Sequence, residues 1–146
     1  MRNILAEYES QAYQARSESN FDRAIDLYEK IIQENPGWEH GEAYLNLASC
    51  YEANGNIEKA EENYLNALRI QPDYYIFVGG YASFLDKYGE PRMAFDWYLK
   101  LFNIEKEMTG SDSVQSLAGR IEHRLFELGA ALGMRDDEIV ELIDSP

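Results

Sequence analysis

The sequence has 146 residues and carries 27 acidic against 13 basic side chains, which gives a formal net charge of −14. Its 45% hydrophobic residues are enough for the packed core of one domain, so the composition excludes a disordered chain despite the charge. The negative charge would repel a nucleic-acid backbone or an anionic membrane surface, and we expect neither as a partner.

The first residues, from Met1 to Glu7, lack the apolar stretch of a signal peptide. No run of about 18 apolar residues occurs anywhere, so the sequence predicts no membrane span. Cys50 is the one cysteine, which excludes an internal disulfide and favours a reducing compartment. We therefore expect a cytoplasmic protein.

A repeat of helical hairpins organises most of the chain. An alanine followed four residues later by a tyrosine recurs at intervals of 36 and 34 residues, and a small residue lies in the helix-like stretch before each pair. Pro36 and Pro72 close the first two units, because proline stops a helix. The pairs are Ala24/Tyr28, Ala60/Tyr64 and Ala94/Tyr98, and the small residues are Ala12, Ala48 and Ala82. We expect the alanines to allow close helix contacts and the tyrosines to fill the space between hairpins. The predicted helices are 2–18, 21–34, 40–53, 57–70, 74–87 and 91–107.

The turns inside the three hairpins are similar to one another. They are Ser19-Asn20, Gly55-Asn56 and Gly89-Glu90. Glycine can take the left-handed conformation that ends a helix, and asparagine can accept N–H bonds at the start of the next. The third turn has Glu90 instead of asparagine, and Pro91 then suits the first turn of the following helix.

These signatures resemble the tetratricopeptide repeat family, whose unit is a helical hairpin of 34 residues. The middle unit carries the most complete set of family positions: Tyr44, Leu47, Ala48, Tyr51, Gly55, Ala60, Tyr64, Ala67 and Pro72. The resemblance covers about residues 5–108 and implies an all-α solenoid of three units, 5–38, 39–74 and 75–108. In the third unit Lys106 stands where the family prefers proline, so the second helix of that unit is free to run on.

Residues 109–146 lack the hairpin signature. Asp112 and Gln115 form a capping pair before an amphipathic stripe, which predicts one helix over about 112–132 that covers the last repeat. The stripe consists of Val114, Leu117, Ile121, Leu125, Leu128 and Leu132. Gly133 ends this helix, and a short acidic helix over about 137–143 either docks or frays.

No constellation of catalytic or metal-binding residues stands out. His40 and His123 lack a ligand spacing to each other or to Cys50, and no phosphate-binding loop or nucleophile elbow occurs. Cys50 is expected as a buried structural thiol and His123 as a solvated helix-surface residue. We therefore expect no enzyme activity, no cofactor, no metal site and no catalytic residue.

The resemblance implies that the first helix of each hairpin lines a concave face that binds a partner peptide or helix. The candidate groove residues at these positions are Tyr13, Arg16, Leu45, Asn46, Ser49, Ile76, Gly79, Gly80 and Ser83. Gly79 and Gly80 either leave space for a bulky group or allow close helix packing. In the family's chaperone-binding subset a clamp of cations and asparagines grips an acidic tail; of its positions only Asn46 matches here, and Glu9 stands where a cation is needed.

The sequence therefore favours a non-enzymatic adaptor that binds a segment of another protein. The alternative is an acidic chaperone or immunity-type inhibitor that occludes a basic client protein, because the acidity either keeps the surface solvated or steers a basic partner. An apolar face of Ile4, Leu5 and Trp38 on the first unit also leaves self-association open.

Overall fold

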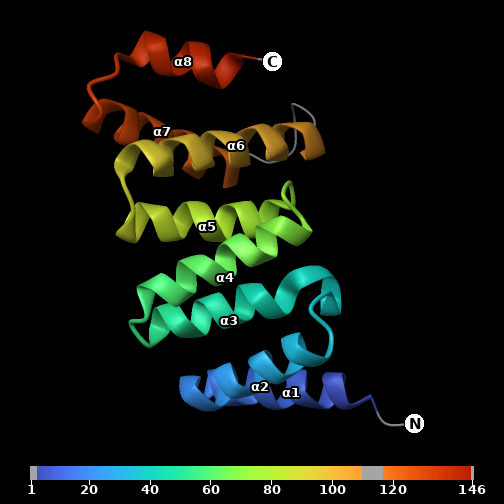
Figure 1. Ribbon diagram of the computed structural model, residues 1–146. Helices are drawn as coiled ribbons and strands as arrows, with labels where there is room; N and C mark the ends of the chain where they lie inside the picture. The colour runs from blue at the N-terminus through green and yellow to red at the C-terminus, as the bar shows by residue number, and fades with distance from the viewer. Residues whose placement is uncertain (1–2, 110–116, 146) are drawn as a thin grey trace. The chain divides into compact units, whose positions relative to one another are not determined.

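The computed structural model describes residues 3–109 and 117–145, and these residues form α-helices joined by short turns, with no strand among them. They belong to two compact units, Met1–Pro72 and Asp73–Pro146 (Figure 1). The all-α repeat architecture predicted from the sequence is confirmed. The division into repeats at about residues 38, 74 and 108 remains a prediction.

The first unit contains two helical hairpins, and each helix packs on the next one along the chain. Close approach is possible because the four repeated alanines, Ala12, Ala24, Ala48 and Ala60, are fully buried in the helix contacts. The helices are α1 (Ile4–Ser17), α2 (Phe21–Glu34), α3 (Glu42–Ala53) and α4 (Ile57–Ile70).

The two hairpin turns of this unit have the predicted chemistry. Ser19 and Gly55 lie in the left-handed region, with φ of 58° and 79°. The side chains of Asn20 and Asn56 then accept the backbone N–H groups at the third position of α2 and α4, at 3.3 and 3.2 Å. Each turn therefore ends one helix and caps the next.

A short 3-10 turn, η1 (Trp38–Gly41), connects the hairpins. Glu39 and His40 have positive φ values of 48° and 56°, and α3 begins only at Glu42. The Gln71 side chain, directly after α4, holds the turn, because its amide nitrogen donates to the His40 carbonyl at 2.8 Å. The helix predicted over 40–53 thus begins two residues later than expected.

The second unit contains a third hairpin and two further helices. Contacts join α5 to α6, α6 to α7, α7 to α8 and α6 to α8 (Figure 1). Its core is rich in buried aromatic rings, among them Phe77, Phe84 and Phe95. The helices are α5 (Tyr75–Tyr88), α6 (Pro91–Thr109), α7 (Leu117–Ala131) and α8 (Asp136–Asp144).

The turn at Gly89 corrects one detail of the sequence interpretation. Gly89 has an extended backbone with φ of −100°, so it does not supply the left-handed conformation expected there. A Cβ at this position would lie 2.7 Å from Leu85 Cδ2 and 3.0 Å from the Leu85 carbonyl oxygen. Glycine is needed because the chain passes close over the last turn of α5.

The third hairpin has Lys106 at the position where proline would end its second helix. Helix α6 continues through this residue to Thr109 and has 19 residues, whereas α5 has 14. The Lys106 ammonium donates to the Ile143 carbonyl at 3.0 Å, and Ile139 and Ile143 of α8 are buried. The terminal helix therefore docks on the second unit instead of fraying.

Helix α7 buries the apolar stripe only in part. Ile121, Leu125 and Leu128 are buried as predicted. Leu132 is 36% exposed, because α7 ends at Ala131 and the chain turns at Gly133 with φ of 81°. The predicted capping pair and the start of the stripe, Asp112, Gln115 and Val114, lie outside the described residues.

Candidate functional site

The nine candidate groove residues are shared between the two units, and each unit is described separately. In the first unit Arg16 Nη1 donates to Asn46 Oδ1 at 2.7 Å, which joins α1 to α3. Tyr13 lies one turn before Arg16 and is 70% exposed, while Leu45 and Ser49 are half-buried on α3. One acceptor position of the Asn46 amide is thus already used before any ligand arrives.

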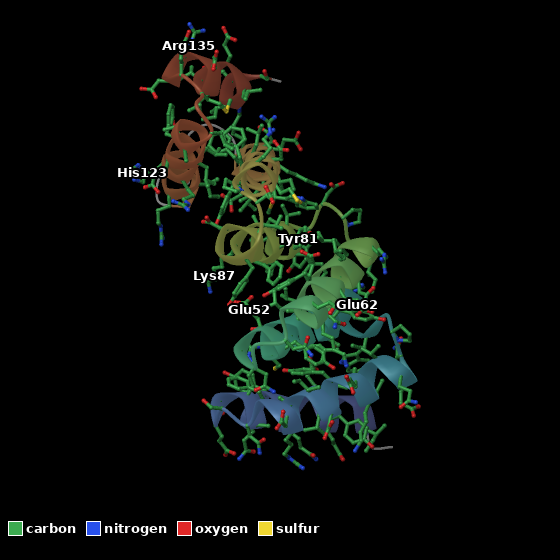
Figure 2. The ribbon with its side chains drawn as sticks, turned by 60° about the vertical axis from the view of Figure 1, so that its left-hand side comes forward. Glu52, Glu62, Tyr81, Lys87, His123 and Arg135 are labelled. Carbon is green, nitrogen blue, oxygen red and sulfur yellow. The ribbon has the colours of Figure 1, made fainter. Side chains whose placement is uncertain are left out.

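A hydrogen bond at the hydroxyl of the repeated tyrosine ties the two helices of each hairpin together; Tyr28 accepts it from Arg16, whereas Tyr64 and Tyr98 donate it to carboxylates. The partner of the tyrosine always lies 12 residues earlier, in the last turn of the first helix (Glu52 is labelled in Figure 2). Burial raises the pKa of Tyr98 to about 12. The repeat period predicts packing for these tyrosines; the constant spacing of 12 residues to a charged side chain is the signal that indicates the hydroxyl contacts as well. The pairs are Tyr28 with Arg16, Tyr64 with Glu52 at 2.9 Å and Tyr98 with Asp86 at 3.2 Å.

In the second unit Asp86 also binds Arg124, which joins α5 to α7. Arg124 Nε donates to Asp86 Oδ2 at 2.8 Å, and the same guanidinium contacts Asp86 Oδ1. The hydrogen bonds from Arg124 hold the pKa of the Asp86 carboxyl below its usual value. The Ser83 hydroxyl is hydrogen-bonded to Tyr98, so this candidate residue belongs to the same network.

A pocket of about 330 Å³ opens beside this network, between α5, α6 and α7. Two candidate residues, Ile76 and Gly79, lie in its wall. A Cβ on Gly79 would lie 3.5 Å from Leu101 Cδ2, which is an ordinary contact, so packing does not require glycine there and its effect is to leave space. Gly80 is half-buried on the next position of α5. The lining residues, which we call the α5–α6–α7 pocket, are Tyr75, Ile76, Gly79, Tyr98, Leu101, Glu105, Arg120, Ile121 and Arg124.

The remaining candidate groups have structural environments. Cys50 is fully buried, and burial raises the pKa of its thiol, as expected for a structural cysteine. His123 lies on α7 on the side away from α6 (Figure 2), and its side chain is 76% exposed. Among residues 3–109 and 117–145 no cluster of His, Cys, Asp and Glu could hold a metal ion. No described helix is both long enough and apolar enough to cross a bilayer.

A comparison with protein-family models identifies the family to which the repeat belongs. Residues 15–75 match the family model described as tetratricopeptide repeat. This segment of the chain therefore belongs to the tetratricopeptide repeat family. The match covers α2, η1, α3 and α4, together with the end of α1 and the start of α5. No curated protein matches the sequence significantly.

Solved structures, two of them named as tetratricopeptide-repeat domains, share the fold over most of the chain. The Sgt2 domain from Aspergillus fumigatus is 21% identical with a TM-score of 0.69, covering 90% of this chain and 81% of that one. The TPR2B domain of yeast Sti1 in complex with pHsp70 is 16% identical with a TM-score of 0.71, over 87% and 97%. The Yersinia enterocolitica type III secretion chaperone SycD, bound to a peptide of the translocator YopD, is 15% identical with a TM-score of 0.76, over 90% and 97%.

These similarities extend the tetratricopeptide-repeat fold beyond the residues that the family model matches. The three structures cover between 87% and 90% of this chain, whereas the family model matches residues 15–75 alone. At identities of 15–21% the likeness concerns the fold. Partner chemistry has to be argued from the side chains themselves.

Proposed function

We propose that this chain is a non-enzymatic, cytoplasmic protein-interaction module that binds a peptide or helix of another protein on the first helices of its repeats. The observation that carries the proposal is the α5–α6–α7 pocket, whose wall includes Ile76 and Gly79 of the candidate groove. Two structures of similar fold hold a partner, pHsp70 in one and a YopD peptide in the other, which supports the same use of the fold here.

The chemistry of the pocket suits an apolar anchor of a partner segment. Tyr75, Ile76 and Leu101 provide apolar wall, and the absent side chain of Gly79 leaves the space open. A volume of about 330 Å³ accommodates a leucine, methionine or aromatic side chain. Arg120 and Arg124 bring polar groups to the pocket that can orient the backbone of the segment.

Filling the pocket tests this function. The Gly79→Leu variant and the wild-type chain would be used to capture partners from the native cell extract, with Gly119→Leu as a matched control on α7, where a Cβ meets nothing within 4 Å. We expect Gly79→Leu to lose partners that the wild type and Gly119→Leu retain. With a purified partner, titration calorimetry should show weaker binding to Asn46→Ala as well. Equal capture by all three chains would contradict a binding role for the pocket.

The net charge of −14 favours a second candidate, an acidic chaperone or immunity-type inhibitor that occludes a basic client. Such a client would bury a large surface, and its affinity would fall steeply between about 50 and 500 mM salt. An adaptor that holds one short segment through an apolar anchor should lose little affinity over the same range. The salt dependence of binding to the captured partner therefore separates the two functions.

An acidic tail of the kind gripped by the chaperone-binding subset should not bind. Glu9 stands where that subset has a cation, and its carboxylate accepts the Trp38 indole N–H at 3.4 Å. A negatively charged tail would meet a carboxylate at this point, which costs binding energy. Fluorescence anisotropy with a labelled acidic pentapeptide should show no saturation at micromolar concentration, and saturation there would overturn the exclusion.

A further inference from the structure

Helix α6 carries a second hollow, most of whose residues lie on the side away from the α5–α6–α7 pocket. Successive residues of an α-helix are turned by about 100°, so Tyr98, Leu101 and Glu105 lie on one side of α6 and Asn103 and Glu107 on the other. The second hollow has a volume of about 790 Å³. Its lining residues, which we call the α6 groove, are Asp73, Asp96, Leu99, Lys100, Asn103, Ile104, Glu107 and Met108.

The α6 groove combines an apolar floor with acidic edges. Leu99 and Ile104 are half-buried and Met108 is 61% exposed, so the three side chains offer apolar surface within one hollow. Asp73 and Asp96 lie at the edges, with side chains that are 80% and 54% exposed. Glu107 adds a third carboxylate three turns along the helix from Asp96.

The cations near the groove leave its edges available to a positively charged partner. Lys100 lies 3.3 Å from Asp73 and also stacks over the Trp97 ring, while Arg92 lies 3.3 Å from Asp96. Ion pairs this exposed contribute little, about 0–1 kcal/mol each, so an incoming cation can share the carboxylates at small cost. The chain's charge of −14 attracts the same cation from a distance.

We propose that the α6 groove binds an amphipathic basic helix of a partner protein. A helix suits this surface because α6 satisfies its own backbone hydrogen bonds and offers no strand edge to an extended peptide. Asp96 and Glu107 are 11 residues apart, which is about 16 Å along α6 at 1.5 Å per residue. A partner helix lying along α6 therefore places Lys or Arg about 11 residues apart, with leucine or methionine between them against Leu99 and Ile104.

This proposal is independent of the proposed function, because no residue lines both the α6 groove and the α5–α6–α7 pocket. Loss of partner capture in Gly79→Leu leaves the α6 groove intact, and the reverse holds for changes at Glu107. Either site can fail in experiment without deciding the other.

The test uses a defined probe, a fluorescein-labelled 18-residue peptide of alanine, leucine and lysine. Its lysines lie 11 residues apart on the leucine face, and a scrambled peptide of the same composition is the control. Anisotropy titrations at about 150 mM salt compare the wild-type chain with Glu107→Lys and with Glu34→Lys, which makes the same charge change on an exposed residue of the first unit. We expect saturable binding of the ordered peptide, weakened about tenfold by Glu107→Lys and less than twofold by Glu34→Lys.

Three results would overturn the proposal. The first is the absence of saturable binding by the wild-type chain while circular dichroism shows that it is folded. The second is equal weakening by Glu107→Lys and Glu34→Lys, or equal binding of the scrambled peptide, since either would show charge attraction without a site. The third is a concentration-dependent dimer that Met108→Asp dissociates in sedimentation, which would make a second copy of the chain the occupant of the groove.

Discussion

Substitution of Gly129 is the most direct test of how the terminal helix α8 docks on α7. A Cβ on this residue of α7 would lie 2.5 Å from Ile139 Cδ1, 2.8 Å from Ile139 Cγ1 and 3.4 Å from Phe95 Cε2. Ile139 is completely buried, so any turn of its side chain has to take place among packed neighbours. Gly129→Ala must therefore push α8 away from α7 or strain the contact.

The magnitude follows from two opposing effects. Alanine in place of glycine inside a helix gains about 1 kcal/mol. Overpacking of a buried contact by one methyl group costs about 1–3 kcal/mol, so the overcrowded contact wins and the net loss is about 1 kcal/mol. Gly119→Ala is the matched control on the same helix, because a Cβ there meets nothing within 4 Å and only the favourable propensity remains.

Urea and thermal denaturation measure the two variants. We expect Gly129→Ala to melt about 3 °C below the wild type and Gly119→Ala to melt at or above it. Ile139→Val removes the closest carbon, so the loss caused by Gly129→Ala should shrink in that background. Hydrogen exchange over 139–143 should also accelerate in Gly129→Ala. If Gly129→Ala stabilises the chain as much as Gly119→Ala does, the docking of α8 described above is wrong.

Three further predictions concern the core and the polar network. Asp86→Asn should lower the free energy of unfolding by roughly 1 kcal/mol at pH 7, a value reduced for the partial exposure of Arg124. Because the folded-state pKa of Asp86 is lowered, the difference from wild type should shrink as the pH falls below about 4. A pH-independent difference in urea titrations would refute the ion pair. Ala60→Leu should lower the free energy of unfolding by about 1–3 kcal/mol, because Ala60 is fully buried. Ala53→Leu, at an exposed position, should change the melting temperature little. Equal melting temperatures of the two variants would contradict the helix register. Cys50 should react with Ellman's reagent only as fast as the native chain opens, because its thiol is buried and its pKa raised; rapid labelling in buffer at pH 8 would contradict the burial.

Local patterns allowed much of the fold to be predicted from the sequence. The period of the alanine and tyrosine pairs placed the helices, and Asn20 and Asn56 cap α2 and α4 as their positions indicated. Capping and helix periodicity depend on residues within about four positions of each other, so the sequence displays them directly. The buried state of Cys50 followed from the same periodicity.

Contacts between distant residues were beyond such patterns. The Asp86–Arg124 pair joins residues 38 positions apart, and α8 docks through the Lys106 contact with Ile143, 37 positions away. Nothing in the local sequence distinguishes these partners among the other charged residues. Gly89 shows a second limit, because the same residue type serves handedness at Gly55 and close approach at Gly89. The pocket that Ile76 and Gly79 line also depends on α7. The repeat pattern did not predict how close α7 lies to α5.

Lys106 also limits how this protein can be lengthened. A repeat array normally grows when a copied hairpin is inserted between two existing ones, because each hairpin presents similar surfaces to its neighbours. After α6 such a copy would have to displace α8 and expose Ile139 and Ile143, while the Lys106 ammonium would lose its carbonyl acceptor. We therefore expect natural or engineered copies with extra hairpins to carry them before Tyr75, and to keep the segment from α5 to α8 as one unchanged block.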